Sequence, residues 1–256
     1  MMIPRVLIIA GSDSGGGAGI QADIKTVTKL GGYAMTAVTA ITAQNSLGVQ
    51  AVHPVPVEMV VAQIDSVVSD LGVDAVKIGM IGSAATATAV ADRLEALEVP
   101  IVFDPVMIAT SGAVLADTAA VTAFARLMHL ASLVTPNIPE LAALGGRDAV
   151  LAHSCHLLAK GGHGESDWIV DELLSPSGPV ARWEARRIDT RGSHGTGCTL
   201  ASGIATGLAQ GMGIEEAVAR AIRFVRIALI HAPGLGQGHG PMGHGLGLCP
   251  FDEIKG

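Results

Sequence analysis

The chain has 256 residues, 49% of them hydrophobic, and carries a net charge of −7, from 16 basic and 23 acidic side chains. Aromatic residues make up only 3% and Lys and Arg form no run, which argues against a nucleic-acid-binding surface and favours small molecules or another copy of the chain as partners. The three cysteines, Cys155, Cys198 and Cys249, show no C-x-x-C spacing, which argues against a disulfide framework or a structural zinc site.

The chain opens with an apolar run, 6–10, that is too short for a signal peptide, so we interpret it as a first β-strand and expect a cytoplasmic protein. Further β-branched runs alternate with segments of helical spacing, the pattern of a largely parallel sheet with helices on both faces. The runs predict strands at 5–11, 34–42, 48–55, 74–80, 100–106, 131–137, 155–162 and 167–173. The other segments predict helices at 57–71, 83–97, 117–130, 198–210 and 214–231, within one α/β domain spanning 1–256.

Gly, Asp, Asn and Lys gather directly after the predicted strands. Because the carboxyl ends of parallel strands open on one side of a sheet, these segments are expected to converge on one rim that holds the ligand site. The segments are GSDSGGGAG, AQNS, GMIGS, DPVMIATSG, TPNIPE and KGGHG.

The segment GTGC, 195–198, stands where a glycine-rich loop turns into a predicted helix. The first N–H groups of a helix and its dipole bind anions, and Gly195 and Gly197 allow a phosphate to approach the backbone while Thr196 offers a hydroxyl. In that field we expect the pKa of Cys198 to be lowered, so that its thiolate acts as a base or a nucleophile. The structural alternative is a small buried residue at a helix start. No G-x-x-x-x-G-K-[ST] segment is present, which excludes a P-loop enzyme.

Several blocks, occurring in one order along nearly the whole chain, closely resemble the hydroxymethylpyrimidine/phosphomethylpyrimidine kinases of thiamine biosynthesis. The blocks are AGSDSGGGAGIQADIKT, TAITAQNSLGV, VKIGMIGS, FDPVMIATSG, TPNIPE, KGGHG and SHGTGC. The resemblance implies a ribokinase-like fold, a homodimer, and ATP-dependent phosphorylation of 4-amino-5-hydroxymethyl-2-methylpyrimidine at its hydroxymethyl group. Phosphorylation of the monophosphate to the pyrophosphate usually follows in this family.

The resemblance also implies roles for individual residues. Cys198 becomes the catalytic base, and residues 195–198 form the anion hole. Gln44 is implied to hydrogen-bond the pyrimidine, a task for which a side-chain amide offers both a donor and an acceptor. Asp23 is implied to face the substrate pocket; a solvated acid is the alternative. Apolar walls would come from Met80, Val106 and Met107, for which ordinary core packing is the alternative.

Phosphoryl transfer from ATP calls for Mg²⁺, which proteins hold through few side chains and several waters. Asn137 and Glu140 match the N-x-x-E motif of the superfamily, and Asp104 is a second candidate for the same water network. Lys160 is expected to approach the ATP phosphates as a point charge. The alternatives are a first-turn acid for Glu140 and a solvated lysine for Lys160. The histidines in glycine-rich loops, His194 among them, carry no assigned chemistry.

Two other functions remain open. The first is a pyridoxine or pyridoxal kinase of the same fold, because both substrates are heteroaromatic rings that carry a hydroxymethyl group. The second is a binding or regulatory protein without turnover, which the GTGC, TPNIPE and FDPV segments argue against.

Overall fold

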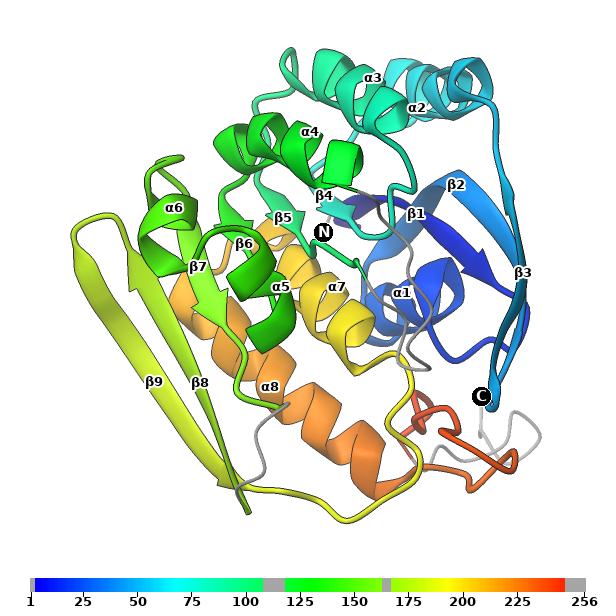
Figure 1. Ribbon diagram of the computed structural model, residues 1–256, viewed down its shortest axis with the longest axis vertical. Coiled ribbons are helices and arrows are strands. Elements are labelled where there is room, and N and C mark those ends of the chain that lie inside the picture. Colours follow the sequence, from blue (N-terminus) through cyan, green and yellow to red (C-terminus); the bar gives the residue numbers. More distant parts are fainter. Residues whose placement is uncertain (1–2, 108–117, 163–166, 247–256) are drawn as a thin grey trace.

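The computed structural model describes residues 3–107, 118–162 and 167–246 (Figure 1). Nine strands form one sheet within these residues, in the order β3-β2-β1-β4-β5-β6-β7-β8-β9. They are β1 (Arg5–Asp13), β2 (Tyr33–Asn45), β3 (Gly48–Pro54), β4 (Ala75–Ile78), β5 (Ile101–Phe103), β6 (Leu133–Val134), β7 (His156–Ala159), β8 (Trp168–Ser175) and β9 (Gly178–Arg186). The six strands from β2 to β7 in the sheet order pair in parallel, whereas β3, β8 and β9 pair antiparallel at the two edges.

Helices cover both faces of the sheet, as the alternation of patterns predicts (Figure 1). On β1, Leu7 and Ile9 belong to one buried cluster, whereas Val6 and Ile8 belong to a second cluster on the opposite face, because successive side chains of a strand point to opposite sides. The first cluster includes residues of α2 (Val57–Asp70), α3 (Ala84–Leu94), α4 (Thr118–Leu130), α5 (Ile138–Ala143) and α6 (Arg147–Leu151); the second includes α1 (Gly19–Lys29), α7 (Thr196–Ala209) and α8 (Ile214–Ile230).

Each of the eight predicted strands overlaps an observed one, but β9 and the short helix α6 were not predicted. The sequence GPVARWEAR of β9 alternates between exposed and half-buried positions on an edge strand, so it lacks the continuous apolar run of the central strands. The predicted helices are also found, although α7 begins at Thr196 rather than at 198. The end of the KGGHG segment lies outside the described residues.

No helix in the described part of the chain combines the length and the apolar character that crossing a membrane requires.

Candidate active site

A cavity of about 1140 Å³ opens at the carboxyl ends of the parallel strands. Residues near the end of β2 and residues that follow β1, β4, β5, β6 and β7 all line it, so the predicted convergence on one rim is confirmed. The cavity also reaches β8, β9 and α8, whose contribution the sequence did not reveal. Predicted residues in its lining are Gln44, Met80, Asp104, Val106, Met107, Asn137, Glu140, Lys160, Gly195, Thr196, Gly197 and Cys198.

The first turn of α7 forms one wall of this cavity. Gly195 is the N-cap, with a left-handed φ of 86°, and a Cβ on it would lie 2.0 Å from the Gly17 carbonyl oxygen, so the position demands glycine. Thr196, Gly197 and Cys198 follow as the first helical residues, whose N–H groups have no acceptor within the helix. The geometry therefore presents backbone donors and a helix dipole to the cavity.

The thiol of Cys198 lines the cavity at the end of this turn and is half-buried. Burial raises its pKa to about 11; Lys77 lowers the pKa, whereas Asp23 and Asp104 raise it further. The expected lowering of the pKa is therefore wrong, because desolvation and two nearby carboxylates outweigh the stabilisation of the thiolate by Lys77 and by the Gly19 N–H. At neutral pH the free site holds a neutral thiol.

Asp23 is fully buried beneath the site and is absent from the cavity lining, so its expected position facing the pocket is wrong. Its Oδ2 accepts from Lys77 Nζ at 2.8 Å, and its Oδ1 accepts from the Ser202 hydroxyl at 2.7 Å. Lys77 is equally buried. A charge in the core needs a partner, and Asp23 and Lys77 are partners of each other. The pair therefore affects the site through its electrostatic influence on Cys198 rather than by contact with a ligand.

Asp104, Lys160 and Glu140 form a charged group on the facing side of the cavity. Asp104 Oδ1 accepts from Lys160 Nζ at 2.8 Å and from the Thr135 hydroxyl at 3.0 Å. Burial raises the pKa of Glu140 to about 7; Lys160 lowers it, and Asp104 raises it. Asp104, which is buried, and Lys160, which is partly buried, lie next to Gly197, since a Cβ there would lie 3.3 Å from Asp104 Oδ2 and from Lys160 Nζ.

The N-x-x-E motif also has a structural role at the start of α5. Asn137 Oδ1 accepts from the Glu140 N–H at 2.9 Å, and Glu140 Oε2 accepts from the Asn137 N–H at 2.8 Å, a reciprocal capping box. This cap holds the Glu140 carboxylate at the cavity wall.

The described residues contain no group of three His, Cys, Asp or Glu side chains that could enclose a metal ion. Asp104 and Glu140 nevertheless fit Mg²⁺ held mainly by water and phosphate oxygens, because that ion needs only one or two protein carboxylates. The donor set favours such an arrangement over an all-protein cage.

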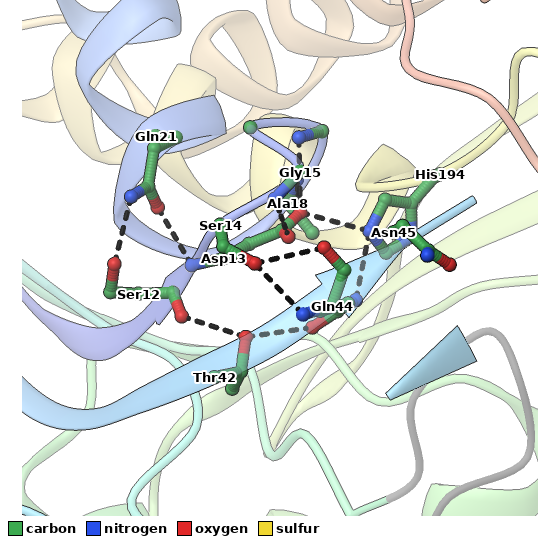
Figure 2. Close-up of polar contacts among 12 residues, drawn as sticks. Ser12, Asp13, Ser14, Gly15, Ala18, Gln21, Thr42, Gln44, Asn45 and His194 are labelled. Carbon is green, nitrogen blue, oxygen red and sulfur yellow. Dashed lines mark hydrogen bonds and ion pairs between the residues drawn. The ribbon is translucent and has the colours of Figure 1, made fainter. Parts of the chain in front are cut away.

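Gln44 lies near the end of β2, where it lines the cavity. Figure 2 shows its amide between Thr42 and His194, next to the loop that follows β1. Met80, Val106 and Met107 supply apolar surface to the same cavity, as predicted.

Sequence reasoning missed Asp13 and Lys77 and left His194 without a role. His194 Nε2 lies 3.0 Å from Asp13 Oδ2, and both side chains are buried. The only signal was indirect: Asp13 sits inside the first family-like block and His194 directly precedes GTGC.

The sequence pattern of the phosphomethylpyrimidine kinase family matches residues 13–243. The chain belongs to that family. It is 46% identical to a hydroxymethylpyrimidine/phosphomethylpyrimidine kinase of Rhizobium meliloti, over 95% of this chain and 97% of that one. It is also 48% identical to a thiamine biosynthesis bifunctional protein of Geobacter sulfurreducens, of which it spans 52%.

Solved structures confirm the ribokinase-like arrangement. By backbone superposition, however, a pyridoxal kinase is more similar to this chain than a phosphomethylpyrimidine kinase is, although its sequence identity is lower. An ADP complex of Bacillus subtilis pyridoxal kinase superposes with a TM-score of 0.88 at 31% identity, covering 96% of this chain and 98% of that one. A phosphomethylpyrimidine kinase of Clostridium difficile gives a TM-score of 0.73 at 35% identity, covering 88% and 98%. We give the sequence more weight for substrate choice, because superposition compares backbones whereas a substrate is read by side chains.

Proposed function

We propose that this phosphomethylpyrimidine kinase family member phosphorylates 4-amino-5-hydroxymethyl-2-methylpyrimidine and its monophosphate with ATP, as a step of thiamine biosynthesis. One observation carries the proposal: the Cys198 thiol, the first turn of α7 and Gln44 line the same cavity, in a family of this activity. An anion site, a proton acceptor and an amide that reads a ring are the parts such a transfer needs.

In this proposal Gln44 binds the aminopyrimidine edge, and Met80, Val106 and Met107 contact the ring faces. The hydroxymethyl oxygen then lies at Cys198, whose thiolate, the minor form at neutral pH, takes its proton as that oxygen attacks the γ-phosphorus and the bond from phosphorus to ADP breaks. A positioned general base contributes about 10²–10⁴-fold to such a step. The N–H groups of Gly197 and Cys198 donate to the transferring phosphoryl group, where charge is spread over the equatorial oxygens.

The charged group of Asp104, Lys160 and Glu140 is proposed to receive the triphosphate. Lys160 Nζ lies beside Gly197 and can donate to a phosphate oxygen from the wall opposite the helix N–H groups. When bound, Mg²⁺ offsets the charge of the triphosphate. Asp104 and Glu140 would hold its water shell.

ATP as donor agrees with the solved neighbours, since one Staphylococcus aureus pyridoxal kinase is described as a complex with AMP-PCP and pyridoxal. That neighbour also supports the second candidate function, a pyridoxal kinase, because its TM-score is 0.87. At 28% identity it is more distant in sequence than the pyrimidine kinases, which reach 46%. The homodimer and the cytoplasmic location expected from the resemblance stay predictions.

Phosphorus NMR with Mg-ATP tests the proposal directly, with hydroxymethylpyrimidine, its monophosphate and pyridoxal offered in separate reactions. A new monophosphate signal followed by a pyrophosphate signal from the pyrimidine is expected. Phosphate transfer to pyridoxal alone would show that the proposed substrate is wrong. No transfer in any of the reactions would show that the proposed kinase activity is wrong.

A further inference from the structure

A carboxylate, an imidazole and an amide form a hydrogen-bonded chain from the first loop to Gln44 (Figure 2). Asp13 Oδ1 accepts from the Gly15 N–H at 2.8 Å, and Oδ2 accepts from the N–H groups of Gly17 and Ala18 at 3.0 and 2.8 Å. Three backbone donors hold this carboxylate in its charged form. Burial works against the charge, yet the pKa of Asp13 is lowered by His194 and by the N–H groups of Ala18 and Gly15.

The carboxylate determines which ring nitrogen of His194 carries the proton. An ionised carboxylate only accepts hydrogen bonds, and His194 Nε2 lies 3.0 Å from Asp13 Oδ2. Nε2 must therefore be protonated, whatever the state of Nδ1.

The side-chain amide of Gln44 lies next to the proton on His194 Nε2. Its terminal nitrogen lies 3.0 Å from the same Nε2, which would bring two donors face to face. At its other end, the Gln44 oxygen lies 3.3 Å from Thr42 Oγ1, but the single hydroxyl proton of Thr42 is used at 2.9 Å on the Ser12 carbonyl oxygen. Both contacts become favourable if the amide makes a half-turn, because its oxygen then shares the Nε2 proton with Asp13 Oδ2 as a second acceptor and its nitrogen donates to Thr42 Oγ1. Two independent proton counts give the same orientation.

We propose that Asp13 and His194 are positioning residues that hold the Gln44 amide with its oxygen toward the imidazole, and thereby select a ring with an amino group over one with a carbonyl. This deepens the proposed function and rests on it. His194 directly precedes the N-cap of α7, so the oxygen end of the amide adjoins the loop that leads to the anion hole. In the pyrimidine the 4-amino group neighbours the reacting hydroxymethyl group, so a donor is needed on that side of the ring. The amide nitrogen then donates to the adjacent ring nitrogen.

The test compares the amino substrate with its 4-oxo analogue, whose ring N–H and carbonyl reverse the donor and acceptor order. The wild-type protein is expected to prefer the amino compound in kcat/KM by on the order of 10³-fold, because the wrong pattern leaves polar groups unpaired. In His194→Leu the amide is free to turn, and the preference should fall to about tenfold or less, mainly through KM. His194→Gln keeps an N–H near the position of Nε2 and should retain most of the preference.

A structural role alone would lower kcat/KM equally for both compounds and leave their ratio unchanged, which would overturn the proposal. The protonated ring nitrogen can be read in the wild-type protein by ¹⁵N NMR of His194, without a variant or a substrate. A proton on Nε2 is expected, and a neutral ring protonated only on Nδ1 would overturn the positioning chain. If neither pyrimidine is phosphorylated, the proposed function fails, while the NMR result still decides the orientation.

Discussion

Lys160 Nζ lies 2.8 Å from Asp104 Oδ1, and the pair faces the backbone of Gly197 in the first turn of α7. Asp104 is buried and Lys160 partly buried, with side-chain exposures of 3% and 13%. Lys160 therefore brings a partly neutralised charge to the wall opposite the helix N–H groups. We expect the transferring phosphoryl group to bind between this pair and the α7 backbone. A small substitution there should therefore lower turnover more than it lowers the free energy of unfolding.

Gly197→Ala tests this gap. A Cβ at this position would lie 3.3 Å from both Asp104 Oδ2 and Lys160 Nζ, so the methyl group would occupy space meant for phosphate oxygens. Ala also favours a helix over Gly by up to about 1 kcal/mol. We expect turnover to fall at least about 10²-fold, the scale of losing one oxyanion donor, while the free energy of unfolding stays level or rises. Urea unfolding and a coupled ADP assay measure both, and an active variant would mean that phosphate does not approach Gly197.

Gly195→Ala should behave in the opposite way. With φ at 86° and a Cβ only 2.0 Å from the Gly17 carbonyl oxygen, the variant must move backbone. The left-handed conformation alone costs about 1–2 kcal/mol for a residue with a Cβ, and the clash adds to it. Gly213 is the matched control, because it is the N-cap of α8 with φ at −63° and has no atom within 4 Å of a built Cβ. Gly195→Ala should lose stability in urea and Gly213→Ala should lose much less; equal losses would contradict the argument.

Cys198→Ala removes the proposed base and leaves the helix N–H groups in place. Turnover should fall by about 10²–10⁴-fold with a small change in KM, since a base acts in the transition state. Cys155→Ala is the control, because that thiol is buried in the core and donates to the Val150 carbonyl oxygen. If both variants turn over alike, Cys198 is not the base.

The sequence predicted the central strands well because most are short apolar runs buried on both faces, as in β5. It also predicted the rim, since loop residues after parallel strands must meet. It did not predict β9, whose alternating edge pattern contains no such run.

The site was harder to predict because the pKa values of its side chains depend on how deeply each side chain is buried and on which charges lie beside it. The GTGC segment indicates a helix start, which on its own favours a thiolate, but no pattern reveals that Asp23 turns inward to Lys77 or that Cys198 sits near two carboxylates. The partners of His194 are equally hidden, because Asp13 is 181 positions away in the chain.

The raised pKa of Cys198 leads to a prediction about alkylation. With the pKa near 11, the reactive thiolate is scarce between pH 7 and 9, and its amount rises about tenfold per pH unit. In a protein with Cys155→Ala and Cys249→Ala, the rate of reaction with iodoacetamide should rise steeply through pH 9 and level off only near pH 11. Free glutathione serves as the reference thiol under the same conditions. A plateau below pH 8 would show that the helix field outweighs burial.

Glu140 should make stability depend on pH in a window set by its pKa. Burial raises that pKa from 4.5 to about 7, so the folded protein binds the proton more tightly than the unfolded chain. The resulting stabilisation is complete below pH 4.5 and is lost as the pH rises to about 7, because there the native state holds more protons than the unfolded state.

Glu140→Gln removes this titration and keeps the capping box, since the Gln oxygen still accepts from the Asn137 N–H. Urea unfolding of both proteins at several pH values from 4.5 to 8 measures the difference. The wild-type protein should lose on the order of 3 kcal/mol relative to the variant as the pH rises through the window, at about 1.4 kcal/mol per pKa unit. If the two stability curves stay parallel, the Glu140 carboxylate ionises as readily in the fold as in the unfolded chain, and its burial next to Asp104 has no electrostatic cost.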